Sequence, residues 1–164
     1  MTIRPILIYP DPGLRKPALP VLTFDDKLAA LALDLVDTMR AANGIGITAA
    51  HIGVSSRVVV IELPGGGEPE LYINPFIEEI GGDLVRFDEG SVSMPGISEQ
   101  VERKNAIKLS YQDINGERHQ LEATGFLSIC LQHEIDQLDG IFWLSRLSLI
   151  KRERAIKRFQ KSLR

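Results

Sequence analysis

The chain has 164 residues, of which 44% are hydrophobic and 25% charged, and its formal net charge is −3. This size and balance predict one globular domain over residues 1–164 and exclude a disordered or fibrous chain. The single cysteine, Cys130, excludes an internal disulfide and a four-cysteine zinc site. No apolar run reaches the ~18 residues of a membrane span, and residues 1–10 do not form a signal peptide, so we expect a soluble, cytoplasmic protein.

The first predicted element is a helix near the amino terminus. Thr23 and Asp26 have the spacing of a capping box, and residues 28–42 (LAALALDLVDTMRAA) follow with helical periodicity. Asn43 and Gly44 then predict the end of this helix, because both residue types tolerate the left-handed conformation of a C-cap.

A β-rich middle follows this helix. Pro64-Gly65-Gly66-Gly67 is typical of a flexible turn, and Asn115-Gly116 is a strong hairpin signal. The segments that we expect to be extended are 57–63, 70–80, 101–112 and 117–122.

Two helices are predicted after the strands. Thr124 should begin a helix that runs to Gly140 and presses Leu127, Leu131 and Leu138 against the sheet. The order of elements, with helix, strands and then two helices, predicts an α+β fold rather than alternating βαβ units.

The terminal helix, residues 148–164, is strongly basic. Its segment 151–164 carries seven basic residues and one acidic residue, a net charge of about +6. This helix could dock on RNA or another polyanion, or it could be a solvated helix with one apolar side. In the second case the residues expected on the core are Leu149, Ile156, Phe159 and Leu163.

The segment 132–137 (QHEIDQ) has the most specific chemistry. In the H-E-x-x-H helix of zinc hydrolases, two histidines hold a metal and the glutamate between them moves the proton of the bound water. Here His133 and Glu134 are present, but Gln137 takes the place of the second histidine. Cys130 lies on the same helix face. The segment therefore keeps the acid/base group and lacks one ligand.

Two further segments contain small and polar residues. Residues 44–51 (GIGITAAH) place two glycines just after the first helix, where the backbone can approach a ligand closely. Residues 89–93 (EGSVS) form a serine-rich turn, and Met94-Pro95-Gly96 is expected to end its strand. Each segment is a weak signal alone, whereas their order and spacing with the third are specific.

These three segments resemble the peptide deformylase family, which shows G-x-G-x-A-A-x-Q, E-G-C-x-S and Q-H-E-x-D-H in the same order. The resemblance covers nearly the whole chain, including residues 8–15, Asn74-Pro75 and residues 138–140. It implies a peptide-deformylase-like fold, with mixed or antiparallel sheets around the central motif helix. It also implies removal of the formyl group from formyl-methionine at the start of new polypeptides, with iron, nickel or zinc held by one cysteine and two histidines.

The same resemblance assigns roles to single positions. Its metal ligands fall on Ser91, His133 and Gln137, so two of the three are substituted. Glu134 is the catalytic acid/base, while His51 replaces the glutamine that stabilises the developing oxyanion together with the Val92 N–H. The peptide backbone would pair with residues 44–46. The positions expected around the substrate are Gly44, Ile45, Gly46, Phe87, Glu89, Phe126, Ile129 and Cys130.

The substitutions predict a binding protein rather than an enzyme. A serine hydroxyl and a glutamine amide are poor ligands for a borderline-soft cation, so we expect no bound cofactor and little or no deformylase activity. The expected partners are polypeptide amino termini, with or without a formyl group, and by analogy the ribosome through residues 151–164. No membrane and no sequence-specific nucleic acid are expected. The alternatives are an active deformylase with an altered iron, nickel or zinc site, and a structural protein with a vestigial pocket.

Three routes could restore chemistry without the missing ligands. Cys130 could act as a replacement thiolate. His51 could join His133 and Glu134 as a set of two histidines and one carboxylate. Ser91 and His133 could instead pair as nucleophile and base without any metal.

Overall fold

The computed structural model describes residues 2–164 and has the predicted α+β composition. Short 3-10 helices occupy three of the connections, namely η1 (Pro12–Arg15), η2 (Ala49–Ile52) and η3 (Trp143–Arg146). The main elements in chain order are α1 (Asp26–Ala41), β1 (Gly46–Thr48), β2 (Val58–Ile61), β3 (Glu70–Ser91), β4 (Met94–Gln112), β5 (Arg118–Thr124), α2 (Gly125–Leu138) and α3 (Leu149–Ser162).

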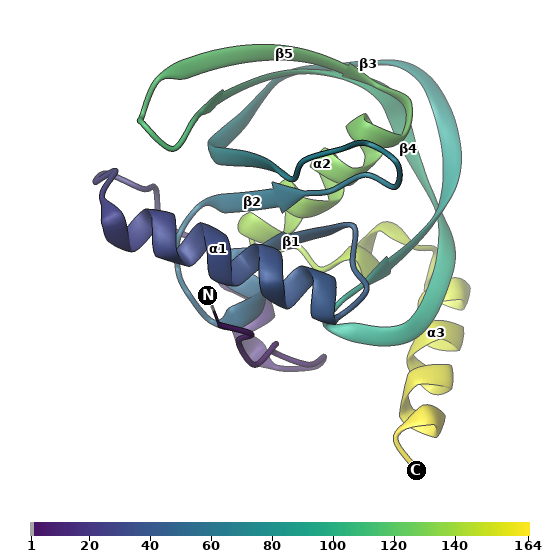
Figure 1. Cartoon of the computed structure of the whole chain (residues 1–164). Coiled ribbons are helices and arrows are strands. Elements are labelled where there is room, and N and C mark those ends of the chain that lie inside the picture. Colours follow the sequence, from purple (N-terminus) through teal and green to yellow (C-terminus); the bar gives the residue numbers. More distant parts are fainter. Residues whose placement is uncertain (1) are drawn as a thin grey trace.

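The five strands form one sheet in the order β1-β2-β3-β4-β5, and every neighbouring pair is antiparallel. The sheet curves around α2, while α1 covers the opposite side of β2 (Figure 1). Val59 and Ile61 pack in the same cluster as α2, whereas Val58 and Val60 pack with α1. Burial on both faces explains why this strand is a continuous apolar run in the sequence.

Strands β3 and β4 form a ribbon that is longer than predicted. Met94-Pro95-Gly96 does not end the strand, because Ser91 pairs with Met94 and Val92-Ser93 forms the turn between them. The prediction also missed the strand continuation through residues 81–91 and 94–100. Several register shifts interrupt the pairing of this ribbon, and such bulges remove the alternation by which strands are recognised. They also bend the ribbon around one side of the molecule (Figure 1).

The ends of α1 show one wrong and one correct prediction. Asp25, not Thr23, is the N-cap, and its carboxylate accepts a hydrogen bond from the Leu28 N–H at 3.1 Å. An aspartate directly before the first helical turn is a strong cap, so Thr23 lies outside the helix. Asn43 adopts a positive φ of 54° after the helix, and Gly44 N–H donates to the Met39 carbonyl, as expected for a helix end.

The β4–β5 hairpin forms where Asn115-Gly116 predicts it. Gln112 pairs with Arg118 across the turn, and Gly116 has a φ of 83° that favours glycine. The strand after the turn begins at Arg118, one residue later than predicted.

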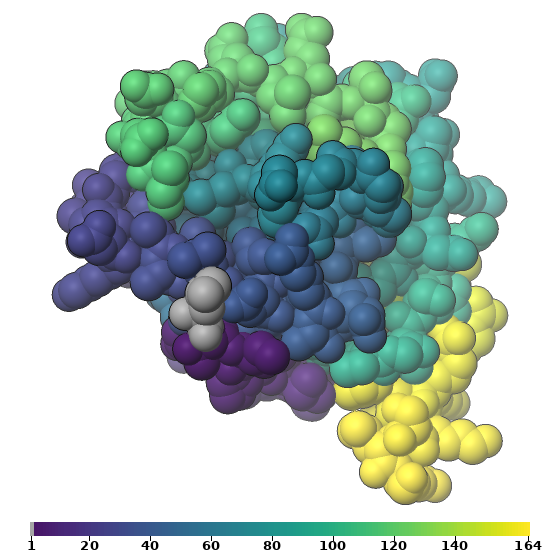
Figure 2. Space-filling model, in the orientation of Figure 1, coloured from purple at the N-terminus to yellow at the C-terminus, as the bar shows by residue number. Residues whose placement is uncertain are grey.

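Helix α3 packs through fewer residues than predicted. Phe159 is buried and Ile156 packs beside it, but Leu149 and Leu163 are 64% and 67% exposed, so the prediction was wrong for these two. The helix lies at one end of the molecule, where only one side of it can meet the body (Figure 2). Among residues 2–164, no helix combines the length and the apolar character that crossing a membrane requires.

Candidate functional site

One cavity of about 660 Å³ brings together residues from β1, the β3–β4 turn and α2. Phe87 and Gln137 are expected at the site but do not line this cavity. Phe87 instead packs behind Phe126, with ring centroids 5.8 Å apart. The predicted residues that do line it are Gly44, Ile45, Gly46, His51, Glu89, Ser91, Val92, Phe126, Ile129, Cys130, His133 and Glu134.

The amino-terminal segment also contributes to the cavity, which the sequence analysis did not anticipate. Ile3, Ile6 and Ile8 line it together with Arg4. Their backbone is held in place because Leu7 N–H donates to the His51 carbonyl at 2.8 Å. The spacing of two between Ile6 and Ile8, which puts both side chains on one side of an extended chain, is a sequence signal that could have identified part of this wall.

Glu89 holds the His133 ring in place. Glu89 Oε1 accepts a hydrogen bond from His133 Nδ1 at 2.8 Å, and both carboxylate oxygens accept from Arg103, at 2.6 and 3.0 Å. Burial alone would raise the pKa of Glu89, but the hydrogen bonds from His133 and Arg103 hold it below its ordinary value. Arg103 also binds Asp136 at 2.9 Å, and Asp136 accepts two further bonds from Arg146. His133 is therefore fixed by a buried network of charges.

Glu134 and His51 present polar atoms that have no hydrogen-bond partner among residues 2–164. These atoms are Glu134 Oε1 and His51 Nε2, and the two residues are only 4% and 1% exposed. His51 Nδ1 accepts from the Thr48 N–H at 2.9 Å, so the proton of the neutral ring lies on Nε2. Burial raises the pKa of Glu134 to about 7 and lowers the pKa of His51 to about 3.

The two glycines of residues 44–46 allow the β1 backbone to approach these groups closely. A Cβ atom at Gly46 would lie 2.7 Å from Glu134 Oε2, and one at Gly44 would lie 2.7 Å from Val92 Cγ1. Any larger residue would therefore displace Glu134 or the β3–β4 turn. The glycines serve this packing in addition to the predicted approach of a ligand.

The three positions that the resemblance assigns to metal ligands do not match such a site here. Gln137 Nε2 donates to the Leu14 carbonyl at 2.7 Å, and the side chain lies outside the cavity lining. Ser91 Oγ accepts from the Ser93 N–H at 3.1 Å. Only His133 keeps the ligand chemistry of its position, and one imidazole is too few donors for a stable site.

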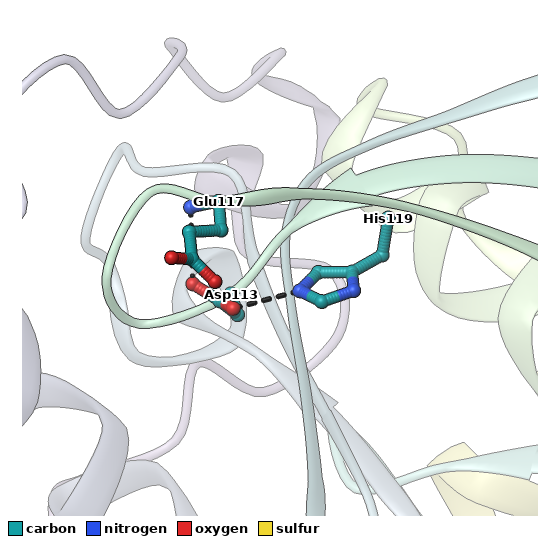
Figure 3. Close-up of side chains that lie close together, drawn as sticks. All are labelled: Asp113, Glu117 and His119. Atoms are coloured by element: carbon teal, nitrogen blue, oxygen red, sulfur yellow. Dashed lines mark hydrogen bonds and ion pairs between the residues drawn. The ribbon is translucent and has the colours of Figure 1, made fainter.

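The described chain contains one group of three histidine and carboxylate atoms within 4.8 Å of one another, and it lies outside the cavity. It comprises Asp113, Glu117 and His119 on the β4–β5 hairpin (Figure 3). Asp113 binds His119 Nε2 at 2.7 Å and also accepts from the Asn115 and Glu117 N–H groups. These contacts close the hairpin turn, which gives the cluster a structural role.

The three alternative routes to chemistry find little support in the geometry. Among residues 2–164, the ligand atoms of His51, His133 and Glu134 do not all lie within 4.8 Å of one another. Burial raises the pKa of the Cys130 thiol to about 12, so it remains protonated at neutral pH. Ser91 and His133 share no hydrogen bond in the part of the chain that the structure describes.

A family model, curated relatives and solved structures all indicate the same protein family. A family model described as polypeptide deformylase matches residues 3–153. A Brucella suis protein named peptide deformylase-like is 58% identical over 98% of both chains. A second B. suis protein, named peptide deformylase, is 40% identical and covers 98% of this chain and 94% of its own. The crystal structure of a peptide deformylase from Synechococcus elongatus in complex with actinonin has a TM-score of 0.92 at 34% identity, over 96% of this chain and 88% of that one.

The buried neutral His51 predicts a pH-dependent stability. A histidine with a lower pKa in the folded state binds fewer protons when folded, so stability falls as pH drops below its unfolded pKa of about 6.5. Urea unfolding should show that His51→Gln loses about 2 kcal/mol less than the wild type between neutral pH and about pH 5. Equal losses in His51→Gln and the wild type would contradict the assignment of a buried, neutral His51.

The charge network predicts unequal effects for two arginines of the same ribbon. Arg103→Ala leaves Glu89 and Asp136 buried without their shared partner and should destabilise the fold by about 3–5 kcal/mol. Arg86→Ala removes only an exposed pair with Glu102 and should cost less than about 1 kcal/mol. The measurement is the urea midpoint of each variant, and similar midpoints would show that the network contributes no stability.

Proposed function

Because this chain belongs to the peptide deformylase family, we propose that it binds polypeptide amino termini and has little or no metal-dependent deformylase activity. The observation that carries this proposal is the contrast between the cavity and the ligand positions. Apart from Phe87, the expected pocket residues line the cavity, whereas the Gln137 amide donates to the Leu14 carbonyl and Ser91 stands where the family has a cysteine thiolate.

The cost of the substitutions supports the loss of activity. The family generally uses a divalent metal. If a bound zinc ion contributes about 10–16 kcal/mol through three or four ligands, losing two removes about 5–11 kcal/mol, or roughly four to eight decades of affinity. Without the ion, the pKa of a water beside Glu134 is far above neutral pH, so no hydroxide is available there.

The sheet offers a place for the peptide backbone. Strand β1 is at one edge of the sheet, where it pairs with β2. Residues 44–46 are half-buried, whereas Ile47 and Thr48 are fully buried, so an extended chain can pair with the edge at residues 44–46. Residues 44–46 at the start of this edge also line the cavity. A peptide could therefore insert its first side chain among Ile45, Phe126 and Ile129 while its backbone follows β1. The S. elongatus relative is in complex with actinonin, a peptide-like inhibitor, which supports peptide binding by this fold.

The relatives support a binding role without catalysis, because two kinds of protein of this family occur in one organism. In B. suis, one protein is named peptide deformylase-like and another peptide deformylase, and this chain is 58% and 40% identical to them, respectively. A cell with both kinds of protein keeps deformylation when one of them loses it. We place this chain with the deformylase-like group.

Helix α3 is the proposed contact with the ribosome, by analogy with the basic terminal helices of related bacterial enzymes. Arg154 and Arg158 both bind Glu99, which neutralises part of the helix charge. Lys157, Lys161 and Arg164 have no ion-pair partner among residues 2–164 and would provide the contact with RNA phosphates.

The proposal predicts binding without turnover. Isothermal titration with peptides that begin with methionine should show saturable binding, whereas a control peptide that begins with aspartate should not bind, because the cavity wall is apolar. Mass spectrometry of a formylated peptide after incubation should recover it intact. Equal binding of the two peptide classes would favour a vestigial pocket, and rapid deformylation would favour an active altered metal site.

Restoring the ligands should restore turnover. The double variant with Ser91→Cys and Gln137→His, loaded with nickel or iron, should hydrolyse formyl-methionyl peptides at least about 100-fold faster than the wild type. Each single variant has only two of the three ligands and should stay near the wild-type rate. A wild type as fast as the double variant would contradict the proposal.

A further inference from the structure

The outer side of strand β5 is a surface at which a second copy of this chain can pair. We propose that the β5 strands of two copies form an antiparallel ladder, so that the two molecules share one continuous sheet. The ladder is centred on Gln120, which places Arg118 of each copy opposite Glu122 of the other. This inference is independent of the proposed function, because no residue of β5 lines the cavity.

Strand β5 is an unprotected edge of the sheet. Among residues 2–164 it pairs only with β4, and it lies at the rim of the molecule (Figure 1). Soluble proteins usually protect an edge strand with a proline, a lysine or a β-bulge. The seven residues of β5 include neither residue type, and they pair with β4 without a register shift. By contrast, several shifts interrupt β3 along its pairing with β4. Strand β5 is therefore the better template for another strand.

The backbone groups on the free side of β5 belong to Arg118, Gln120 and Glu122. At the hairpin turn, Asp113 N–H donates to the Glu117 carbonyl at 2.9 Å, so this pair is bonded across the two strands. Bonded and non-bonded pairs alternate along an antiparallel ladder. The N–H and C=O groups of residues 118, 120 and 122 therefore point away from β4. A second β5 in the centred register presents the same groups in the opposite direction, so every one of them gains a partner.

The charges along this edge are self-complementary. Arg118 and Glu122 are exposed, and neither has an ion-pair partner among residues 2–164. A two-fold axis at Gln120 brings each of them beside the opposite charge of the other copy, so the same pair forms twice. Opposite charges that face each other across antiparallel strands are stabilising, whereas like charges are destabilising. A register shifted by two residues separates these charges, so they select the centred one.

The same register pairs side chains on the inner face of the sheet. His119 of one copy falls opposite Leu121 of the other. Leu121 packs at the border of the cluster around α2, and the Tyr111 ring stacks on His119 with centroids 5.4 Å apart. Contact between the two side chains therefore adds buried apolar area to the backbone ladder.

The register also brings the hairpin turn of one copy to the beginning of α2 in the other. Glu117 falls opposite Ala123, two residues before the helix. The first turn of α2 contains no acidic residue, and its N-cap Thr124 makes no side-chain hydrogen bond to the helix. A carboxylate near a helix N-terminus is stabilising. The turn of the second copy thus supplies a charge that the first turn of α2 lacks.

Sedimentation velocity of the untagged protein tests the association. Only one short strand from each molecule takes part, and interfaces below about 1,200 Å² belong to weak complexes, so the dimer should be reversible. Between about 5 and 500 µM the protein should change from monomer to dimer, with a Kd on the order of 10–100 µM. A monomer over the whole range would overturn the inference and would leave this edge to an unrelated strand.

Exchange of the two charges tests the surface and the register. Arg118→Glu and Glu122→Arg each create two like-charge pairs and should weaken the dimer at least about tenfold. The double variant restores opposite charges and should return to within about threefold of the wild-type Kd. Lys16→Glu makes the same charge change as Arg118→Glu at an exposed position outside the sheet, and it should leave the Kd unchanged.

The remaining outcomes decide between this ladder and another contact. Single variants that dimerise like the wild type would show that the copies meet at a different surface. A double variant that stays as weak as the single variants would overturn the centred register. Gln120→Pro removes an N–H on the free side and no bond to β4, so the folded variant should remain monomeric. Circular dichroism verifies its fold, and a dimer as tight as the wild type would overturn the backbone ladder.

Discussion

The buried carboxylate of Glu89 is the constraint on which the rest of the site depends. It binds Arg103 of the neighbouring strand and His133 of α2. Arg103 also binds Asp136, and Asp136 in turn binds Arg146. A buried ion is tolerated only with its partners in place, so these contacts fix the ribbon, the motif helix and η3 relative to one another. The β3–β4 turn is thereby held at the cavity, where Ser91 and Val92 lie with Glu134.

Local patterns predicted most of the fold, and the failures have physical causes. Strand β2 was predictable because burial on both faces requires an apolar run, and the β4–β5 turn because Asn115-Gly116 favours positive φ. The continuation of the β3–β4 ribbon was not, since bulges and exposed positions remove its alternation. The periodicity of the sequence predicted the helix α3. It could not show that the side chains of Leu149 and Leu163, which were expected on the core, remain exposed to solvent.

The order of the three short segments indicated which residues lie around the cavity, but it did not indicate which hydrogen bonds those residues make. Sequence could not show that Gln137 reaches the Leu14 carbonyl, 123 positions away, or that Glu89 is the partner of His133. Both depend on where distant segments meet. The result is a cavity lined by apolar residues and by Glu134, while Gln137, which the resemblance assigns to a metal ligand, donates a hydrogen bond to a backbone carbonyl. Glu134 and His51 are left with buried polar atoms that a ligand can satisfy.

We propose that this site binds peptide ends and holds no catalytic metal. The most direct test is elemental analysis of untagged protein, purified anaerobically without chelators, with formyl-methionyl peptide hydrolysis measured on the same sample. We expect iron, nickel and zinc far below one equivalent, and no turnover above background. Near-stoichiometric metal together with turnover would contradict it and would mean that other side chains replace the missing ligands.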